Sequence, residues 1–245
     1  MAHPAAAAAA PQVPAFIVHN FNTIRHLGAG GYGVTWQACA NAKGAAPDID
    51  GGEDLQGVPR GPELVVKMMQ NSGQFANVLE LEHMIIELPD IKNCPNVMSS
   101  LGFVDDPFED RAYLIIEYGG PTLDTKLWDH RQDGLPRNEV RDISSQLVNA
   151  HRALHRAGVI YRDHKMDNVV VGADGMVRLI DLGCFKEMGE QGYPADLNSW
   201  VREFRPTEVL LKQQYGLKAD ISALGQLLFW TAYDRSPFGQ RVVNG

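Results

Sequence analysis

The densest group of chemically useful side chains lies at residues 161–168, where the sequence reads YRDHKMDN. Asp163 is a candidate general base, and Lys165 is a candidate cation for binding a phosphate group. Asn168 supplies an amide oxygen, and Asp181, which opens an Asp-Leu-Gly motif, supplies a carboxylate. Oxygen ligands of this hard type are those that Mg²⁺ prefers. The pattern therefore indicates a site that combines a base, a cation and a metal.

The residues between Asn168 and Asp181 indicate how these two side chains come together. Apolar runs at 169–171 and 177–180 flank the turn sequence Ala-Asp-Gly at 173–175. Two short β-rich runs around such a turn predict a tight hairpin, which returns the chain to its starting point.

The glycines Gly28, Gly30 and Gly33 fit the pattern G-x-G-x-x-G. One interpretation is a dinucleotide-binding unit, for which Asp48 has suitable spacing, but that unit needs a helix directly after the glycines. Residues 34–38 instead read VTWQA, a β-branched and aromatic run that predicts a strand. A strand on each side of the glycines makes a hairpin. Because its glycine turn has no Cβ atoms, the backbone there is able to approach phosphates. A purely structural glycine-rich hairpin is the simpler alternative.

Lys67 follows the apolar run at 64–66. Taken alone, a lysine at the end of a strand is usually a solvated edge charge. A helix is expected at about 75–88, and Glu82 falls in the middle of its apolar stripe. Because an unpaired buried carboxylate is costly, Glu82 is expected to pair with Lys67, with Glu80 as the second choice. The stripe consists of Phe75, Val78, Leu79, Ile85 and Ile86.

The periodicity changes along the chain. Five short β-rich runs precede residue 119, at 21–27, 34–39, 64–69, 101–104 and 112–118. Helical spacing dominates after Asn138, and another helix is expected after Asp220. These patterns predict an α+β protein, with a strand-rich lobe at 20–118 and a helical lobe at 119–245.

Two segments lack such periodicity. Residues 1–19 are rich in alanine and proline and predict a disordered tail. Residues 41–62 are dense in Gly, Ala, Asp and Pro and predict a flexible insert within the first lobe.

Composition excludes several classes of protein. The 22 basic and 30 acidic residues give a formal charge of −8, which argues against nucleic-acid binding. No apolar run approaches the ~18 residues of a spanning helix, so no membrane association is expected. The three cysteines, Cys39, Cys94 and Cys184, suit neither a disulfide framework nor a zinc motif. A reducing compartment, cytoplasmic or nuclear, is therefore expected.

From residue 21 to about 239 the sequence resembles the eukaryotic protein kinases. It carries the main motifs of that family in the family's order: the glycine loop, the lysine strand, the 161–168 segment and the Asp-Leu-Gly motif. The resemblance implies a bilobal α+β fold, with a small antiparallel β lobe containing one helix and a mainly helical large lobe. It also implies ATP and Mg²⁺ as cofactors and a protein as substrate.

The resemblance assigns the nucleotide contacts. Gly28, Gly30 and Gly33 would cover the ATP phosphates, and Lys67, paired with Glu82, would bind the α- and β-phosphates. A further implied contact is the hinge from Glu117 to Gly119, which would hydrogen-bond the adenine base behind Ile116.

The resemblance also assigns the catalytic contacts. Asp163 would orient the substrate hydroxyl, Lys165 would contact the γ-phosphate, and Asn168 and Asp181 would ligate Mg²⁺. Lys165 resembles serine/threonine kinases. Residues 202–211 resemble the end of the activation segment in the branch that contains the cyclin-dependent and mitogen-activated kinases. Asp220 would hydrogen-bond the backbone of the 161–168 segment.

Other features keep a second function open. Thr35 stands where a valine normally packs on adenine, and Val201 stands where related kinases carry a threonine. The chain ends soon after the expected central helix, so it is expected to be either a fragment or a degenerate kinase with a shortened large lobe. The apolar side of residues 224–230 is then expected to cause self-association or to need a partner protein as cover; a monodisperse monomer would contradict this. The alternatives are a pseudokinase that acts as a scaffold and a small-molecule kinase.

The last expectation concerns regulation. Arg162 resembles the arginine that binds a phosphorylated residue in many kinases, and Asp196 lies where that residue is expected. Asp196 would then replace the phosphate, or would simply be a solvated loop residue. Ser199 and Tyr193 are the alternative phosphorylation sites.

Overall fold

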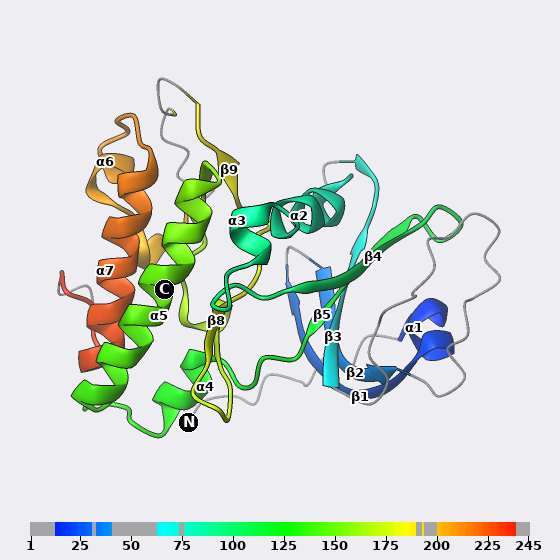
Figure 1. Ribbon diagram of the computed structural model, residues 1–245, viewed down its shortest axis with the longest axis horizontal. Coiled ribbons are helices and arrows are strands. Elements are labelled where there is room, and N and C mark those ends of the chain that lie inside the picture. Colours follow the sequence, from blue (N-terminus) through cyan, green and yellow to red (C-terminus); the bar gives the residue numbers. More distant parts are fainter. Residues whose placement is uncertain are drawn as a thin grey trace, which may run out of the picture. The chain divides into compact units, whose positions relative to one another are not determined.

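The computed structural model describes residues 13–30, 33–40, 63–73, 76–189, 193 and 200–238. Its chain forms two compact units, Met1–Glu80 with Ser100–Tyr118 and Leu81–Ser99 with Gly119–Gly245 (Figure 1). Residues 1–12 of the expected tail and all of the expected insert at 41–62 lie outside the described residues.

The first unit is built on a five-stranded antiparallel sheet with the order β1-β2-β3-β5-β4. The β-rich runs of the sequence account for all five of these strands. The strands are β1 (Phe21–Gly30), β2 (Gly33–Ala40), β3 (Glu63–Gln70), β4 (Ser100–Asp106) and β5 (Arg111–Glu117). The sheet confirms the small antiparallel β lobe.

The glycine segment joins β1 to β2. Gly30 pairs with Gly33 across the antiparallel ladder, so a strand follows the glycines and the dinucleotide-binding interpretation is wrong. Gly33 has a φ of +104°, and a Cβ there would lie 2.1 Å from the carbonyl oxygen of Met68 on β3. Only glycine fits at this position, because both the backbone conformation and the neighbouring strand exclude a side chain.

The short helix α1 (Ala15–Asn20) corrects the expectation of disorder for residues 15–19. Phe16 and Ile17 are buried, and the Phe16 ring stacks on Tyr113 of β5 with its centroid 4.3 Å away. The Asn20 side chain donates to the Phe16 carbonyl at 2.8 Å. Burial of two large apolar side chains offsets the entropy lost in ordering this turn.

The rest of the described chain is mainly helical, as predicted, with two small antiparallel ribbons, β6-β9 and β7-β8. The helices are α2 (Val78–Ile86), α3 (Pro89–Lys92), α4 (Leu123–Trp128), α5 (Arg137–Arg156), α6 (Thr207–Leu210) and α7 (Leu217–Tyr233). The short strands are β6 (Val159–Ile160), β7 (Val169–Val171), β8 (Val177–Leu179) and β9 (Lys186–Glu187). The antiparallel β7-β8 pair is the hairpin predicted between Asn168 and Asp181.

The core of the second unit lies along α5. The apolar residues at helical spacing after Asn138 predicted its inner face: Ile143, Leu147, Ala150 and Leu154 are buried, and Val140 is half-buried. Helix α7 packs beside it (Figure 1). The packed helices α5 and α7 therefore support the loop between β6 and β7.

Residues 81–99 belong to the second unit, whereas the sequence analysis assigned them to the first. The Asn96 side chain donates to the carbonyl of Val177 at 2.8 Å and accepts from Asn149 of α5 at 2.8 Å. The Met98 amide donates to the carbonyl of Leu179 at 3.0 Å. These hydrogen bonds fix the segment to α5 and β8, and neither partner could be read from local sequence patterns.

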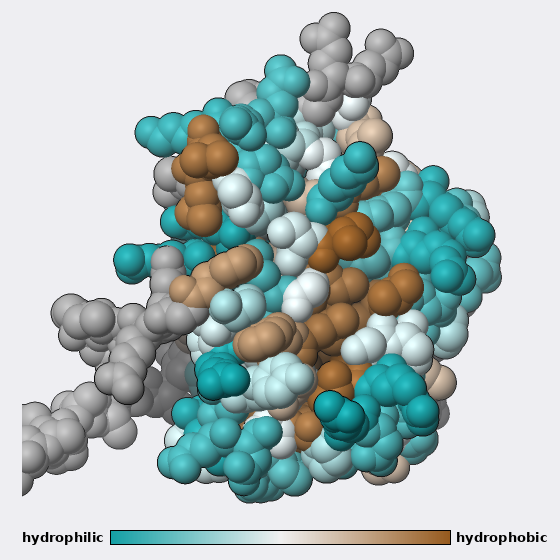
Figure 2. Space-filling model, turned by 90° about the vertical axis from the view of Figure 1, so that its left-hand side faces the viewer, coloured by the Kyte–Doolittle hydropathy of each residue, from teal (hydrophilic) through white to brown (hydrophobic). Residues whose placement is uncertain are grey.

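Helices α6 and α7 carry an apolar surface. Figure 2 shows apolar side chains gathered across this face of the molecule. Leu211 and Ile221 are exposed, whereas Leu224 and Leu227, part of the segment expected to need a cover, are buried. Coverage of this surface by a partner protein stays a prediction. Among the described residues, no helix is both long enough and apolar enough to cross a membrane.

The packing of α1 gives a first prediction. Ile17→Ala should lower the free energy of unfolding by about 2–4 kcal/mol, because Ile17 is fully buried and its truncation leaves a cavity. The matched control is the neighbouring Val18→Ala, which should change it by less than about 0.5 kcal/mol because Val18 is 59% exposed. Urea unfolding measures both. Equal effects would show that α1 does not pack on the sheet in solution.

Candidate active site

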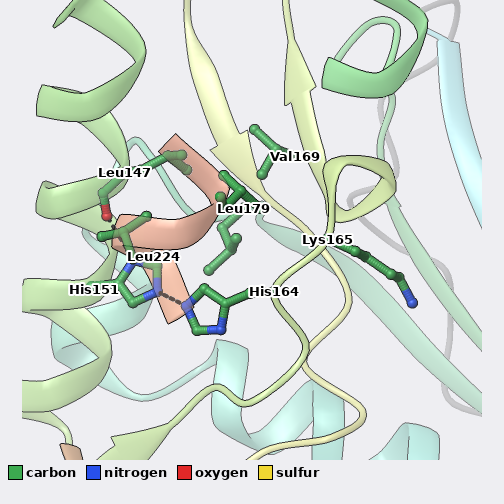
Figure 3. Close-up of a pocket in the computed structure, with 8 residues that line it drawn as sticks. Leu147, His151, His164, Lys165, Val169, Leu179 and Leu224 are labelled. Atoms are coloured by element: carbon green, nitrogen blue, oxygen red, sulfur yellow. Dashed lines mark hydrogen bonds between the residues drawn. The ribbon is translucent and has the colours of Figure 1, made fainter. Parts of the chain in front are cut away.

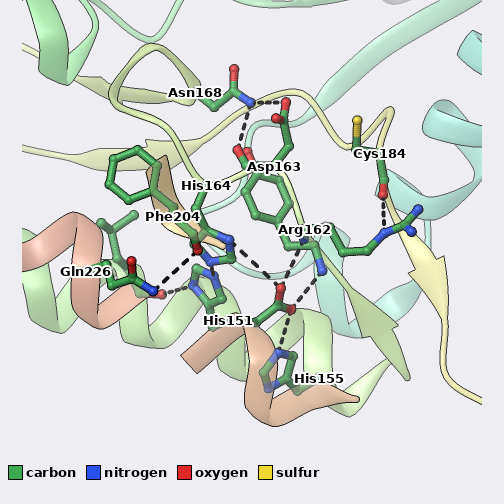
Figure 4. Close-up of polar contacts among 12 residues, drawn as sticks. His151, His155, Arg162, Asp163, His164, Asn168, Cys184, Phe204 and Gln226 are labelled. Atoms are coloured by element: carbon green, nitrogen blue, oxygen red, sulfur yellow. Dashed lines mark hydrogen bonds and ion pairs between the residues drawn. The ribbon is translucent and has the colours of Figure 1, made fainter. Parts of the chain in front are cut away.

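The predicted catalytic residues meet in the loop between β6 and β7. Lys165 Nζ donates to Asp163 Oδ2 at 2.9 Å, and Asn168 Nδ2 donates to the same oxygen at 2.6 Å. The Lys165 side chain points away from the apolar pocket beneath the loop (Figure 3). Asn168 also donates to the backbone carbonyl of Asp163 at 3.1 Å (Figure 4). The loop therefore presents one carboxylate held by a cation and an amide.

The electrostatics of this group favour the charged forms. Burial alone would lower the pKa of the Lys165 ammonium, but the charge of Asp163 and its hydrogen bond raise it above its usual value. Lys165 thus stays protonated at neutral pH. Asp163 is 6% exposed, so its contact with this cation is poorly screened by water.

The structure also brings the two predicted metal ligands together. The amide of Ile180 donates to the carbonyl of Asn168 at 2.9 Å, which places Asp181 directly beyond this contact. The φ of Asp181 is +59°, and its Oδ1 accepts from the Gly183 amide at 3.2 Å. Because Asn168 Nδ2 is directed to Asp163, the amide oxygen is the atom of this side chain that could hold a metal. An amide oxygen and a carboxylate form a donor set that fits Mg²⁺.

Asp220, at the start of α7, holds the first residues of the loop, as expected. Its Oδ2 accepts from the Tyr161 amide at 2.8 Å and from His155 Nε2 at 3.0 Å, and its Oδ1 accepts from the Arg162 amide at 3.0 Å. Burial would raise the pKa of this carboxyl, but the His155 hydrogen bond and the other donors lower it below its usual value. Asp220 is therefore ionised although it is fully buried.

Arg162 links the loop to the chain after the Asp-Leu-Gly motif. Its Nε donates to the carbonyl of Cys184 at 2.7 Å, its Nη2 to that of Phe185 at 3.0 Å, and its Nη1 to the Tyr215 hydroxyl at 3.1 Å. The expected partner, Asp196, lies outside the described residues, as does Ser199. The described contacts of Arg162 are thus two backbone carbonyls and one hydroxyl.

Glu82 is buried, as its stripe position predicted, whereas Glu80, the second choice, is exposed. Glu82 Oε1 accepts from the amide of Leu182 at 3.0 Å, so α2 is tied to the Asp-Leu-Gly motif. Lys67 lies within β3 rather than at its end, and it is 7% exposed. It is therefore no solvated edge charge. Its pairing with Glu82 stays a prediction.

The remaining predicted contacts are backbone positions. Glu117 is the last residue of β5, and a Cβ on Gly119 would lie 2.4 Å from the Met98 side chain and 2.6 Å from that of Val170. Gly119 is thus required for close packing within the second unit. No described atom lies within 4 Å of the place where a Cβ of Gly28 would be, so the backbone there is open.

Comparison with known proteins decides the family. A model of the protein kinase domain matches residues 57–244. The chain belongs to the protein kinase family. The match covers Lys67, Glu82, Asp163, Asn168 and Asp181, whereas the glycine hairpin of this kinase precedes the matched range.

Several known kinases resemble parts of this chain. Protein kinase C zeta type of Oryctolagus cuniculus is 37% identical over 52% of this chain and 22% of its own length. Sperm motility kinase 2B of Mus musculus is 30% identical over 73% of this chain and 36% of its own length. Mitogen-activated protein kinase kinase kinase 1a of Physcomitrium patens is 31% identical over 66% of this chain and 21% of its own length. This kinase domain therefore spans only about a fifth to a third of these relatives.

Sequence reasoning missed three histidines beneath the loop between β6 and β7 of this kinase domain. His155 contacts Asp220, and His151 contacts His164. A signal existed for His151, because it lies four residues after the buried Leu147 and so shares its face of α5. His164 follows Asp163 in an irregular loop, where no periodicity could indicate its burial.

Asp220 gives a prediction with a defined pH dependence. Asp220→Asn should lower the free energy of unfolding at pH 7 by about 2–4 kcal/mol, because two backbone amides and His155 lose a buried anionic acceptor. The folded pKa of Asp220 lies below its ordinary value of 3.8, so its ionisation stabilises the fold above that value and stops doing so as the pH falls through the folded pKa. The difference between the two proteins should therefore shrink below about pH 4.

Thermal melts between pH 7 and pH 3 measure this difference. Asp129→Asn is the charge-matched control, because Asp129 is exposed at the end of α4. A deficit in Asp220→Asn that equals the control, or that persists unchanged at pH 3, would show that the ionised carboxylate does not support the loop.

Proposed function

We propose that this chain is an ATP-dependent kinase that transfers the γ-phosphate to serine or threonine hydroxyls of a protein substrate. The observation that carries the proposal is the arrangement of Asp163, whose Oδ2 accepts from both Lys165 and Asn168. Family membership supports protein kinase activity in general. The choice of serine and threonine rests on Lys165, two residues after the catalytic aspartate.

In this proposal Asp163 acts on the acceptor. Its Oδ2 is held by two donors, and Oδ1 would accept the hydrogen of the substrate hydroxyl. The hydroxyl oxygen would then bond to the γ-phosphorus, the bond from that phosphorus to the leaving oxygen would break, and the proton would pass to Asp163. Phosphoryl transfer mainly requires such alignment together with neutralisation of charge. Lys165, which is protonated, would supply part of that neutralisation.

The proposal assigns the nucleotide and the metal to the remaining residues. Asn168 and Asp181 would hold Mg²⁺, which when bound offsets the negative charge of the phosphates. The open backbone at Gly28 and the buried ammonium of Lys67 would contact those phosphates.

The second candidate is a nucleotide-binding pseudokinase that acts as a scaffold. The observation in its favour is Val201, at the start of the 3-10 turn Arg202–Phe204, which has no hydroxyl to offer to Asp163 or Lys165. The presence of Lys67 and of the whole 161–168 segment favours the enzyme. The two functions differ in phosphate transfer and share nucleotide binding, so separate experiments test them.

Nucleotide binding is tested by thermal stabilisation. Mg·ATP at about one hundred times its dissociation constant should stabilise the fold by about 2.7 kcal/mol, because it binds only the folded chain. Asp181→Asn should remove most of this shift, because a metal-ligating carboxylate is lost, whereas Asp129→Asn should retain it. No shift at millimolar nucleotide in a folded sample would contradict both candidate functions. An equal shift with a chelator present would contradict the metal site proposed at Asn168 and Asp181.

Catalysis is tested by transfer to a generic basic protein. Asp163→Asn should lower kcat by about 100-fold or more while the affinity for Mg·ATP stays nearly unchanged, because Asp163 acts on the acceptor hydroxyl. Lys67→Ala should damage both kcat and nucleotide affinity. Equal turnover by the original chain and by both variants would identify the activity as a contaminant, and binding without any transfer would favour the pseudokinase.

A further inference from the structure

Two buried histidines form a direct contact beneath the catalytic loop. His151 Nε2 on α5 lies 2.8 Å from His164 Nε2 in the loop, and the two residues are 1% and 2% exposed. Their ring centroids are 4.9 Å apart and their planes differ by 25°. Because the nitrogens lie about 2 Å closer than the centroids, the rings meet edge to edge, which suits a hydrogen bond in the ring planes.

The neighbouring groups determine which nitrogen carries each proton. His151 Nδ1 lies 2.8 Å from the carbonyl oxygen of Leu147, and a carbonyl only accepts, so this nitrogen must donate. In a neutral His151, Nε2 is then the acceptor, and His164 Nε2 must donate to it. This leaves His164 Nδ1 as a bare lone pair, and that atom has no hydrogen-bond partner within the described part of the chain.

The surroundings keep both rings neutral. Leu147, Val169, Leu179, Leu224 and Leu227 line the small pocket around the pair (Figure 3). Burial lowers the pKa of His151 and lowers that of His164 to about 3. A hydrogen bond is stronger in such an apolar environment than in water, so the bond between His151 and His164 fixes the orientation of both rings.

The other charged group nearby does not compete for the pair. His164 Nδ1 is 4.0 Å from Asp220 Oδ1, beyond hydrogen-bond distance, and Asp220 Oδ2 is occupied by His155 and the Tyr161 amide. The described residues include no group of histidine, cysteine and acidic side chains arranged to hold a metal ion. The pair is therefore a structural contact between α5 and the loop.

The position of this contact along the chain is informative. Asp220 fixes the backbone of Tyr161 and Arg162 on one side of Asp163, and His164 follows Asp163 directly on the other. We propose that His151 and His164 are positioning residues. Their imidazole–imidazole hydrogen bond fixes the backbone on the C-terminal side of Asp163 to α5. The kinetic consequence rests on the proposed kinase function, whereas the effect on the loop does not.

Four variants isolate this hydrogen bond. His164→Leu removes the donor and leaves His151 Nε2 without a partner. His164→Gln retains an N–H at a similar reach and should restore the bond. The double variant of His151→Leu and His164→Leu replaces both polar groups by apolar ones, which should leave thermal stability nearly unchanged. His151→Leu alone completes the cycle.

The first readout is independent of activity. Imidazole nitrogen NMR of the full chain at pH 7 should show a proton on Nδ1 of His151 and on Nε2 of His164. Amide hydrogen exchange at Tyr161 and Arg162 should be about tenfold faster in His164→Leu and in the double variant, and close to the original rate in His164→Gln.

The second readout is kinetic. In His164→Leu and in the double variant, kcat should fall about tenfold while KM for ATP changes by less than about twofold, because the acceptor base is displaced and the nucleotide contacts are not. His164→Gln should restore most of kcat. A double variant as stable as the original chain with low kcat would separate positioning from general destabilisation.

Three results would overturn the inference. They are a proton on Nδ1 of His164, unchanged exchange at Tyr161 and Arg162 in His164→Leu and in the double variant, and equal damage in His164→Gln. Failure of the kinase proposal looks different: the original chain would show the expected protonation and exchange rates but no phosphate transfer. That result would leave the positioning inference supported and remove only the catalytic role of Asp163.

Discussion

The buried carboxylate of Asp220 determines where the loop between β6 and β7 lies. It accepts from the amides of Tyr161 and Arg162 and from His155, so both of its oxygens are satisfied without water. A buried anion is costly unless it is fully hydrogen-bonded, and these donors are what keep it ionised. The two amides in turn need the carboxylate as their acceptor, because they lie in an irregular loop where no strand or helix partner is available to them. Helix α7 and the loop are thereby made interdependent.

Two residues of the site have backbone conformations that non-glycine residues rarely adopt. Arg162 and Asp181 have φ values of +68° and +59°, each of which costs on the order of 1 kcal/mol. Both are offset by local hydrogen bonds: Arg162 through the carbonyls of Cys184 and Phe185, and Asp181 through the amide of Gly183. Arg162 directly precedes Asp163, the proposed base, and Asp181 is a proposed metal ligand. The backbone thus changes direction where side chains from different segments must meet.

The sequence predicted those parts of the molecule that depend on local spacing. The β7-β8 hairpin, the strand after the glycines and the inward position of Glu82 follow from patterns within about ten residues of one another. The parts that were missed depend on distant partners. Helix α1 is ordered by contact of Phe16 with Tyr113, and residues 81–99 join the second unit through Asn96 and its contacts on α5 and β8. His164 is buried through contact with another helix, and nothing in its neighbours along the chain indicates this.

The hydrogen bond from Asn168 to Asp163 has a consequence for chemical ageing. Spontaneous deamidation would convert Asn168 to a carboxylate, and two carboxylate oxygens would then face each other at the 2.6 Å now spanned by an N–H donor. Like charges so close retain a shared proton, and the pair would lose the free acceptor that Asp163 now offers. Deamidation requires attack by the backbone nitrogen of Val169, and that N–H is donated to the carbonyl of Met166. The same 3-10 turn that orients the amide of Asn168 therefore also engages the backbone nitrogen that would attack it, which opposes deamidation.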